Sequence, residues 1–292
     1  MGFGRILTAM VTPFKDNLEV DFEEAKRLAA YLMAHGSDGI VVCGTTGESP
    51  TVTAAEKIEL FRAVKEAVGN EGIVIANVGS NSTDSSIGLA KEAAACQVDG
   101  LMVVVPYYNK PSQEGMYQHF KAVAEATALP VMLYNVPSRT AVGLAPATVK
   151  RLAEVTNIVA IKEAANSMDQ VSELKRLLPA DFQVYSGDDS LTLPMLALGC
   201  DGVVSVASHI VGDEMKKMID MWFAGNTSAA ASWHLKLHPV FKGIFITTNP
   251  VPIKALVNML GFKAGGVRLP LVKATPDEEQ FLARLLHDIK EG

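Results

Sequence analysis

The chain has 292 residues, of which 49% are hydrophobic and 20% are charged, a composition that supports a large buried core and excludes a disordered or low-complexity protein. Its 26 Lys and Arg residues against 32 Asp and Glu residues give a net charge of -6 without a basic cluster, which argues against nucleic acid as a partner. No apolar stretch reaches the roughly 18 residues of a membrane-spanning helix, so we expect no membrane association.

The cysteines and the N-terminus indicate a cytoplasmic protein. Cys43, Cys96 and Cys200 are an odd number, lie far apart and have apolar or small neighbours, as buried free thiols in a reducing compartment do. The first residues lack the charged and apolar regions of a signal peptide. We therefore expect a cytoplasmic location, with neither a disulfide nor a zinc framework.

Short runs rich in Val and Ile recur through the first two-thirds of the chain. They are continuous rather than alternating, which is typical of strands buried on both faces of a parallel sheet. The eight runs are residues 6–11, 39–43, 73–78, 101–105, 131–134, 158–161, 182–185 and 203–206.

Helical patterns separate these runs. Capping boxes at residues 21–24 and 53–56 open amphipathic stretches over residues 22–35 and 54–68. Further helices are expected to begin near Thr83, Gln113, Ala147, Met168 and Leu191, and four more to span residues 213–223, 227–246, 251–260 and 276–290.

This alternation predicts the α/β class and a (β/α)8 (TIM) barrel over residues 1–223, followed by a C-terminal helical extension over residues 224–292 that packs on the barrel. A doubly wound sheet is the competing architecture. Its Rossmann version is disfavoured because no G-x-G-x-x-G follows the first run, and no Walker A motif is present.

Lys162 is the strongest catalytic candidate. Active sites of such barrels lie at the C-terminal ends of the strands, and Lys162 continues the sixth run with the same inward parity as Ala160. Burial disfavours an ammonium, and a neutral amine attacks a carbonyl to form a Schiff base without a metal. The alternatives are that Lys162 reaches the rim or pairs with Glu163.

Two further side chains at strand ends share this parity argument. Thr45, in step with Val41 and Cys43, and Tyr134 are expected to point inward near Lys162, where a tyrosine held by a threonine hydroxyl can shuttle protons. Tyr134 could equally be a buried aromatic with a satisfied hydroxyl. The turn at residues 44–47 offers backbone N–H groups for a carboxylate.

Arg139, on a loop at the same rim, suits a bidentate grip on a second carboxylate, although a solvated surface arginine is the commoner case. Metal sites are not favoured. His234 and His238 are four residues apart but lack a third ligand, and Asp188 and Asp189 are better explained as helix caps than as Mg²⁺ ligands.

Together, four segments resemble the dihydrodipicolinate synthase (4-hydroxy-tetrahydrodipicolinate synthase) family of pyruvate-dependent class I aldolases. They are GTTGE at residues 44–48, PYYNKP at 106–111, YNVPSRT at 134–140 and IKE at 161–163. The resemblance runs from Ile6 to about Pro270 and includes SGDD at residues 186–189 and NPVPIK at 249–254.

The resemblance implies a role for each candidate. Lys162 forms an imine with pyruvate, which takes the place of a cofactor, and the resulting enamine attacks L-aspartate 4-semialdehyde in lysine (diaminopimelate) biosynthesis. The proton relay consists of Tyr134, Thr45 and Tyr108, with Tyr108 acting across a tight dimer interface of a homotetramer that is a dimer of dimers. The substrate-binding residues are Thr46, the backbone of Val204 and Gly187 for pyruvate, and Arg139 for the semialdehyde carboxylate.

One departure concerns feedback by lysine. Family members that lysine inhibits bind it at the dimer interface, and Ser49, Asn81 and Tyr107 match that site. Lys57 stands where those members carry His, and Ser85 where they carry Glu. Because a carboxylate is missing and a cation is added, we predict weak or absent lysine feedback.

Two other functions remain to be weighed. A sugar-acid lyase, such as N-acetylneuraminate lyase or a 2-keto-3-deoxy sugar acid aldolase, shares the lysine and tyrosine, but generally lacks Arg139 and carries GSTGE where this chain has GTTGE. A silent paralogue that senses a keto acid is free to lose Lys162, Tyr134 and Thr45, and this chain keeps all of them.

Overall fold

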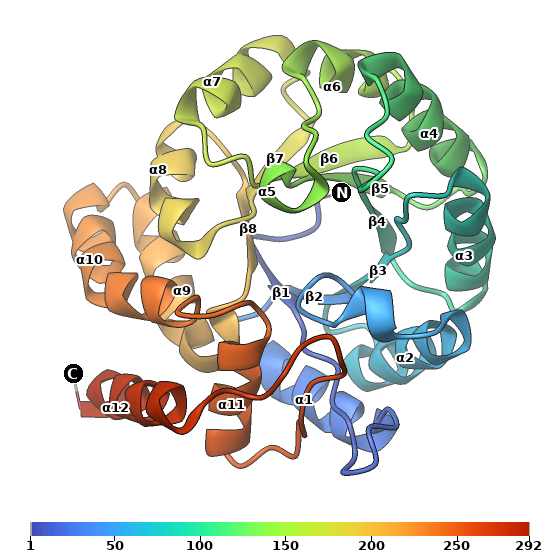
Figure 1. Cartoon of the computed structure of the whole chain (residues 1–292). Coiled ribbons are helices and arrows are strands. Elements are labelled where there is room, and N and C mark those ends of the chain that lie inside the picture. Colours follow the sequence, from blue (N-terminus) through green and yellow to red (C-terminus); the bar gives the residue numbers. More distant parts are fainter. Residues whose placement is uncertain (1, 292) are drawn as a thin grey trace.

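The computed structural model describes residues 2–291, and within this part of the chain eight parallel strands close into a barrel (Figure 1). Neighbours in sequence are neighbours in the sheet, and β8 pairs with β1. The strands are β1 (Ile6–Ala9), β2 (Gly39–Val42), β3 (Ile73–Asn77), β4 (Gly100–Val104), β5 (Val131–Asn135), β6 (Ile158–Glu163), β7 (Gln183–Ser186) and β8 (Gly202–Ser205). The predicted (β/α)8 barrel is confirmed.

Helices surround the barrel, and the last three lie together on one side of it (Figure 1). The surrounding helices are α1 (Phe22–Ala34), α2 (Ala54–Val68), α3 (Thr83–Ala95), α4 (Gln113–Glu125), α5 (Pro137–Thr140), α6 (Pro146–Leu152), α7 (Met168–Leu177), α8 (Thr192–Ala197) and α9 (Ser208–Phe223). The C-terminal extension contains α10 (Thr227–Gly243), α11 (Val251–Met259) and α12 (Pro276–Glu291). Short 3-10 helices, η1 (Ser49–Thr51) and η2 (Asp189–Leu191), follow β2 and β7.

Several boundaries differ from the prediction. The strand β6 continues through Lys162 and Glu163, beyond the apolar run that ends at Ile161. The helix α9 begins at Ser208, before its predicted start, and contains a break with non-helical dihedral angles at Val211. The short helices η1 and α5 were not expected, and both lie in loops at the barrel mouth.

The strands are buried on both faces, which explains their continuous apolar sequence. Leu7, Val41, Met132 and Ala160 belong to a cluster inside the barrel, whereas Ile40 and other residues of opposite parity pack beneath the helices. Cys43, Cys96 and Cys200 are buried free thiols, as expected. Burial raises the pKa of both the Cys43 and the Cys200 thiol to about 12.

The two predicted capping boxes have different outcomes. Thr53 and Glu56 form a complete capping box at the start of α2. At the start of α1 the Asp21 side chain accepts from the Glu24 N–H, but the backbone N–H of Asp21 donates to the carbonyl of Pro13. The Glu24 carboxylate instead binds Arg27, so the prediction of a second full box was wrong.

The C-terminal extension packs on the barrel through α10 and α11, which both contact α9, and α12 packs against α11. Met215 and Met218 of α9 are fully buried and belong to the core beneath the helices. No helix within residues 2–291 is long and apolar enough to cross a membrane.

Candidate active site

Lys162 lies near the C-terminal end of β6, one residue before the strand ends at Glu163. It is the register partner of Tyr134 on β5 and of Tyr185 on β7. Its side chain is 5% exposed, and Nζ lies 4.3 Å from the centre of the Tyr134 ring. The sequence-based expectation that Lys162 and Tyr134 meet inside the barrel is confirmed by this geometry.

Glu163 points away from Lys162, because successive side chains of a strand lie on opposite faces. Its carboxylate accepts from Asn135 Nδ2 at 3.1 and 3.0 Å, from the Ala165 N–H at 2.7 Å and from Gln170 Nε2 at 3.0 Å. Burial raises the pKa of Glu163, and these donors oppose the shift. The alternative in which Lys162 pairs with Glu163 is therefore wrong.

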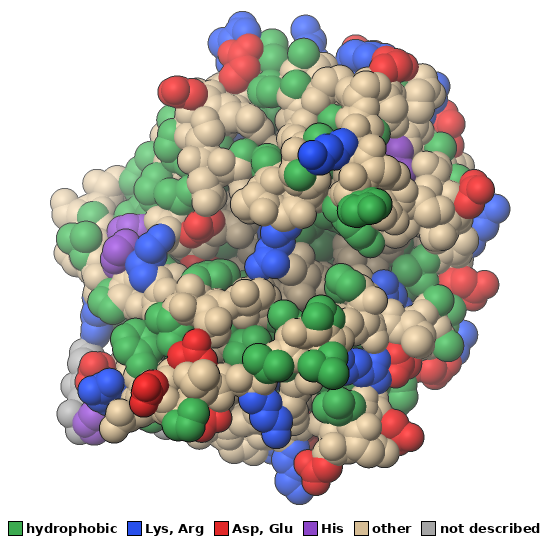
Figure 2. Space-filling model, in the orientation of Figure 1, with side chains coloured by type: hydrophobic (Ala, Val, Ile, Leu, Met, Phe, Trp, Pro, Cys, Tyr) green, Lys and Arg blue, Asp and Glu red, His purple; other side chains and the backbone are tan. Residues whose placement is uncertain are grey.

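A cavity of about 210 Å³ brings three of the predicted side chains together. Figure 2 shows this face of the molecule hollowed near the centre of the barrel. Thr45, Tyr134 and Arg139 line the cavity, and Lys162 lies against the ring of Tyr134. The other lining residues are Ser49, Pro50, Asn77, Gly79, Val104, Tyr107, Val136 and Thr140.

Thr45 reaches the cavity for a different reason from the one expected. Val41 lies inside the barrel, but Cys43 has a φ of 56° and its side chain packs outside, beneath the helices. The alternation of the strand therefore ends before Thr45, and the left-handed turn at Cys43 redirects the chain. Within the described residues, the Thr45 hydroxyl has no hydrogen bond to Tyr134.

The loop that contains Thr45 and Thr46 is held by hydrogen bonds from several elements. Thr12 Oγ1 donates to the Gly47 carbonyl at 2.7 Å, and Asn77 Nδ2 donates to the Cys43 carbonyl at 2.9 Å. Thr46 is 3% exposed, and its Oγ1 accepts from Asn249 Nδ2 at 3.0 Å. Asn249, the first residue of the NPVPIK segment, is a contact of this loop that the sequence did not predict.

Gly187 lies directly against the Lys162 side chain. A Cβ atom at this position would meet Ala164 Cβ at 2.6 Å and Lys162 Cε at 3.2 Å, so a larger residue would displace the lysine. The backbone N–H of Gly187 donates to the Glu163 carbonyl at 2.8 Å, which fixes the turn after β7 beside β6. This contact supports a glycine at the predicted pyruvate site.

Val204 belongs to the cluster inside the barrel. The turn after it is held by Asp189, which accepts from Ser205 Oγ at 2.5 Å and from the N–H groups of Val206 and Ala207 at 3.1 and 3.0 Å. Burial raises the pKa of Asp189. Both Asp188 and Asp189 were expected to be helix caps. Asp188 does cap η2, but Asp189 instead anchors the turn after β8.

Two predicted residues are exposed. Tyr108 is 88% exposed, has a φ of 73°, and does not line the cavity formed by this chain. Arg139 lies on α5, and in the described part of the chain its guanidinium has no ion pair, so it is available to an anion entering the cavity.

Metal ligation finds no support among residues 2–291, where no group of three or more His, Cys, Asp or Glu side chains could hold an ion. The rings of His234 and His238 lie 6.2 Å apart on α10.

Comparison with known proteins decides the family. The profile of the Dihydrodipicolinate synthetase family matches residues 2–289. The chain belongs to this family. It is 59% identical over 288 residues to the 4-hydroxy-tetrahydrodipicolinate synthase of Desulforamulus reducens, covering 98% of this chain and 97% of the relative. The predicted family and enzyme class are confirmed.

Solved structures agree in fold. A dihydrodipicolinate synthase from Bacillus anthracis has a TM-score of 0.96 and 49% identity, covering 98% of both chains. The dihydrodipicolinate synthase of Cyanidioschyzon merolae, solved with lysine bound, has a TM-score of 0.97 and 47% identity, covering 99% of this chain and 98% of the other. These relatives favour the synthase over a sugar-acid lyase.

Proposed function

We propose that the chain condenses pyruvate with L-aspartate 4-semialdehyde through a Schiff base on Lys162, giving 4-hydroxy-tetrahydrodipicolinate in lysine (diaminopimelate) biosynthesis. The observation that carries the proposal is the placement of the Lys162 amine against Tyr134, in a barrel mouth that also presents Arg139. A buried amine, a phenol and a guanidinium are the groups that this reaction requires.

In the first half of the reaction, the amine of Lys162 attacks the C2 carbonyl of pyruvate. A C–N bond forms, the carbonyl electron pair moves to oxygen, and this oxygen takes up protons and leaves as water. Tyr134, whose ring contacts Nζ, supplies and recovers these protons. Thr46, Gly187 and the Val204 backbone hold pyruvate beside the lysine.

In the second half, the iminium loses a proton from its methyl group and becomes an enamine. The enamine carbon attacks the semialdehyde carbonyl, a C–C bond forms, and the new alkoxide is protonated by the tyrosine relay. Arg139 binds the semialdehyde carboxylate through paired N–H donors. The substrate amine then displaces Lys162 from the imine carbon, which closes the ring and frees the enzyme.

The relay includes a residue from a second subunit. Tyr108 is exposed in the single chain. When a second subunit packs against this surface, the Tyr108 side chain can enter the active site of that subunit. We propose a homotetramer built as a dimer of dimers, in which the tight dimer is the smallest active unit. The enzyme works in the cytoplasm and uses the covalent imine in place of a cofactor or metal.

Nuclear magnetic resonance of a mixture of both substrates tests the reaction. The proposal predicts one-to-one consumption of pyruvate and semialdehyde and the appearance of a single cyclic product. Consumption of pyruvate with a sugar aldehyde, but not with the semialdehyde, would favour a sugar-acid aldolase. No consumption of either would favour a keto-acid sensor.

A further inference from the structure

The C-terminal extension reaches the loop that carries the predicted pyruvate-binding threonines. We propose that Asn249 is a positioning residue for pyruvate: its amide donates to Thr46 Oγ1, so that the Thr46 hydroxyl directs its own proton to the pyruvate carboxylate. This inference rests on the proposed function, because it assigns a task to a residue of the same site.

The hydrogen bond between the two side chains is short and buried. Asn249 Nδ2 lies 3.0 Å from Thr46 Oγ1, and the two residues are 6% and 3% exposed. A hydroxyl group has one proton to give and two lone pairs to accept with. Since the amide occupies a lone pair, the proton remains free, and the described residues offer it no acceptor.

Asn249 is not satisfied by the fold alone. Its Oδ1 is buried and has no hydrogen-bond partner within the described part of the chain. Buried polar atoms are nearly always paired, and an unpaired one requires an explanation. A residue kept for packing would be better served by an apolar side chain of the same size, whereas a residue kept to orient Thr46 needs the amide.

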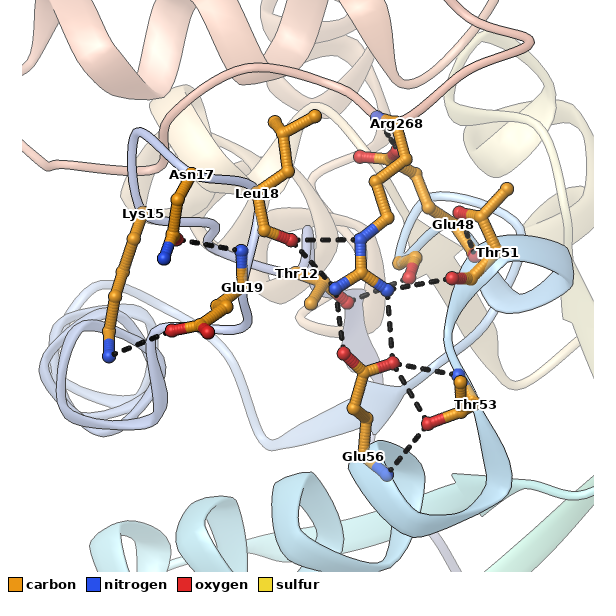
Figure 3. Close-up of polar contacts among 11 residues, drawn as sticks. Thr12, Lys15, Asn17, Leu18, Glu19, Glu48, Thr51, Thr53, Glu56 and Arg268 are labelled. Atoms are coloured by element: carbon orange, nitrogen blue, oxygen red, sulfur yellow. Dashed lines mark hydrogen bonds and ion pairs between the residues drawn. The ribbon is translucent and has the colours of Figure 1, made fainter.

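The extension is anchored firmly enough to fix this geometry. Lys254 Nζ binds Glu48 Oε1 at 2.8 Å, with both side chains at most 2% exposed, and the Arg268 N–H binds Glu48 Oε2 at 2.9 Å. The Arg268 guanidinium also holds Glu56 and the Leu18 carbonyl (Figure 3). Glu48 closes the loop that begins before Thr46, so both sides of the Asn249–Thr46 contact are held.

If the Asn249 amide were flipped, the predicted effect of its removal on pyruvate binding would be reversed. If Asn249 presented Oδ1 to Thr46, it would accept the hydroxyl proton and withdraw that donor from the substrate. Removing the amide would then strengthen pyruvate binding. In the orientation proposed here, removing the amide leaves the hydroxyl unaligned and weakens pyruvate binding.

The substitution Asn249→Leu tests this, because leucine has the same branching at Cγ and the same number of side-chain heavy atoms as asparagine but no polar side-chain atom. The readouts are KM for each substrate, kcat, and the pyruvate dependence of borohydride trapping on Lys162 without semialdehyde. We expect the KM for pyruvate to rise about five- to twentyfold, as for loss of a hydrogen bond to a charged ligand. The KM for semialdehyde is expected to stay within about twofold.

Two further comparisons isolate the path through Thr46. In a Thr46→Val background, Asn249→Leu is expected to add no further rise, because the hydroxyl it orients is gone. Asn258 is the matched control. It lies on α11 of the same extension and binds the Gly265 backbone at 2.9 and 3.2 Å, so Asn258→Leu is expected to leave the KM for pyruvate unchanged.

Thermal unfolding of each variant separates these effects from a loss of folded protein. An unchanged or lower KM for pyruvate in Asn249→Leu would overturn the inference, as would an equal rise in the Thr46→Val background. Failure of the wild-type protein to trap pyruvate on Lys162 would contradict the proposed function itself, which is a separate result.

Discussion

Nζ of Lys162 lies 4.3 Å from the centre of the Tyr134 ring, and the two residues are register partners on β5 and β6. Because the strands are rigid and hydrogen-bonded side by side, this arrangement does not depend on a flexible loop. The amine and the phenol are thereby held together before a substrate arrives. Gly187 completes the arrangement, since its missing side chain leaves room for the lysine stem.

A mixture of two inactive variants tests the role of Tyr108. Tyr108→Phe removes the relay hydroxyl and is expected to lower kcat by about 10²-fold or more, while Lys162→Ala abolishes the imine. If Tyr108 serves the neighbouring site, subunits exchanged between the two variants will assemble some complete sites, and activity will reappear. Absence of recovery in mixed oligomers, verified by mass, would contradict a role for Tyr108 in the neighbouring site.

The close packing of Gly187 predicts the effect of adding a methyl group. Gly187→Ala places Cβ 2.6 Å from Ala164 Cβ and 3.2 Å from Lys162 Cε, so we expect a loss of about 1–3 kcal/mol in the free energy of unfolding and a lower kcat. The control is Gly88→Ala on α3, where a Cβ atom meets nothing within 4 Å. That variant is expected to gain about 0.5–1 kcal/mol. Equal stabilities would contradict the packing argument.

His209 predicts an acid sensitivity of the fold. It is buried, accepts from the Val11 N–H through Nε2 and contacts the Val206 carbonyl through Nδ1, and burial lowers its pKa from 6.5 to about 4. Since the unfolded chain binds the proton more readily, stability falls as the pH drops from 6.5 towards 4, by up to about 3 kcal/mol.

The substitution His209→Gln isolates this contribution. Burial raises the pKa values of Glu163 and Asp189, so their protonation stabilises the folded protein as the pH falls. Both residues are present in the wild type and in His209→Gln, so their contributions cancel when the two proteins are compared. Chemical denaturation at several pH values is expected to show that the free energy of unfolding falls less on acidification in His209→Gln than in the wild type. The exposed His238→Gln is the control, and parallel curves for all three proteins would refute the assignment.

Lysine feedback is expected to be weak or absent. Ser49 and Tyr107 line the same cavity as Tyr134, so bound lysine would lie beside the active site. Ser85 provides no carboxylate for the ligand's ammonium group, and Lys57 adds an amine in place of the histidine. An inhibition curve that saturates at sub-millimolar lysine would contradict this prediction. The double substitution Lys57→His and Ser85→Glu is expected to create such a curve.

The sequence predicted most of the barrel because each strand carries a continuous apolar run, and the parity of a strand places Lys162 and Tyr134 inside. Parity failed for Thr45, because the positive φ at Cys43 ends the alternation and no local sequence signal marks it. Asn249 was missed because its contact with Thr46 spans 203 positions of the sequence. Such a contact depends on how the extension folds back, which periodicity cannot reveal.

Borohydride trapping tests the central claim most directly. The protein is incubated with pyruvate, with and without L-aspartate 4-semialdehyde, and then reduced with borohydride. Intact mass spectrometry measures the adduct, and peptide mapping identifies the modified residue. The account predicts a pyruvate adduct on Lys162 that disappears when semialdehyde turns over, and none in Lys162→Ala. An adduct on another residue, or no adduct at all, would contradict the Schiff-base mechanism, and an adduct that semialdehyde leaves untouched would contradict the synthase assignment.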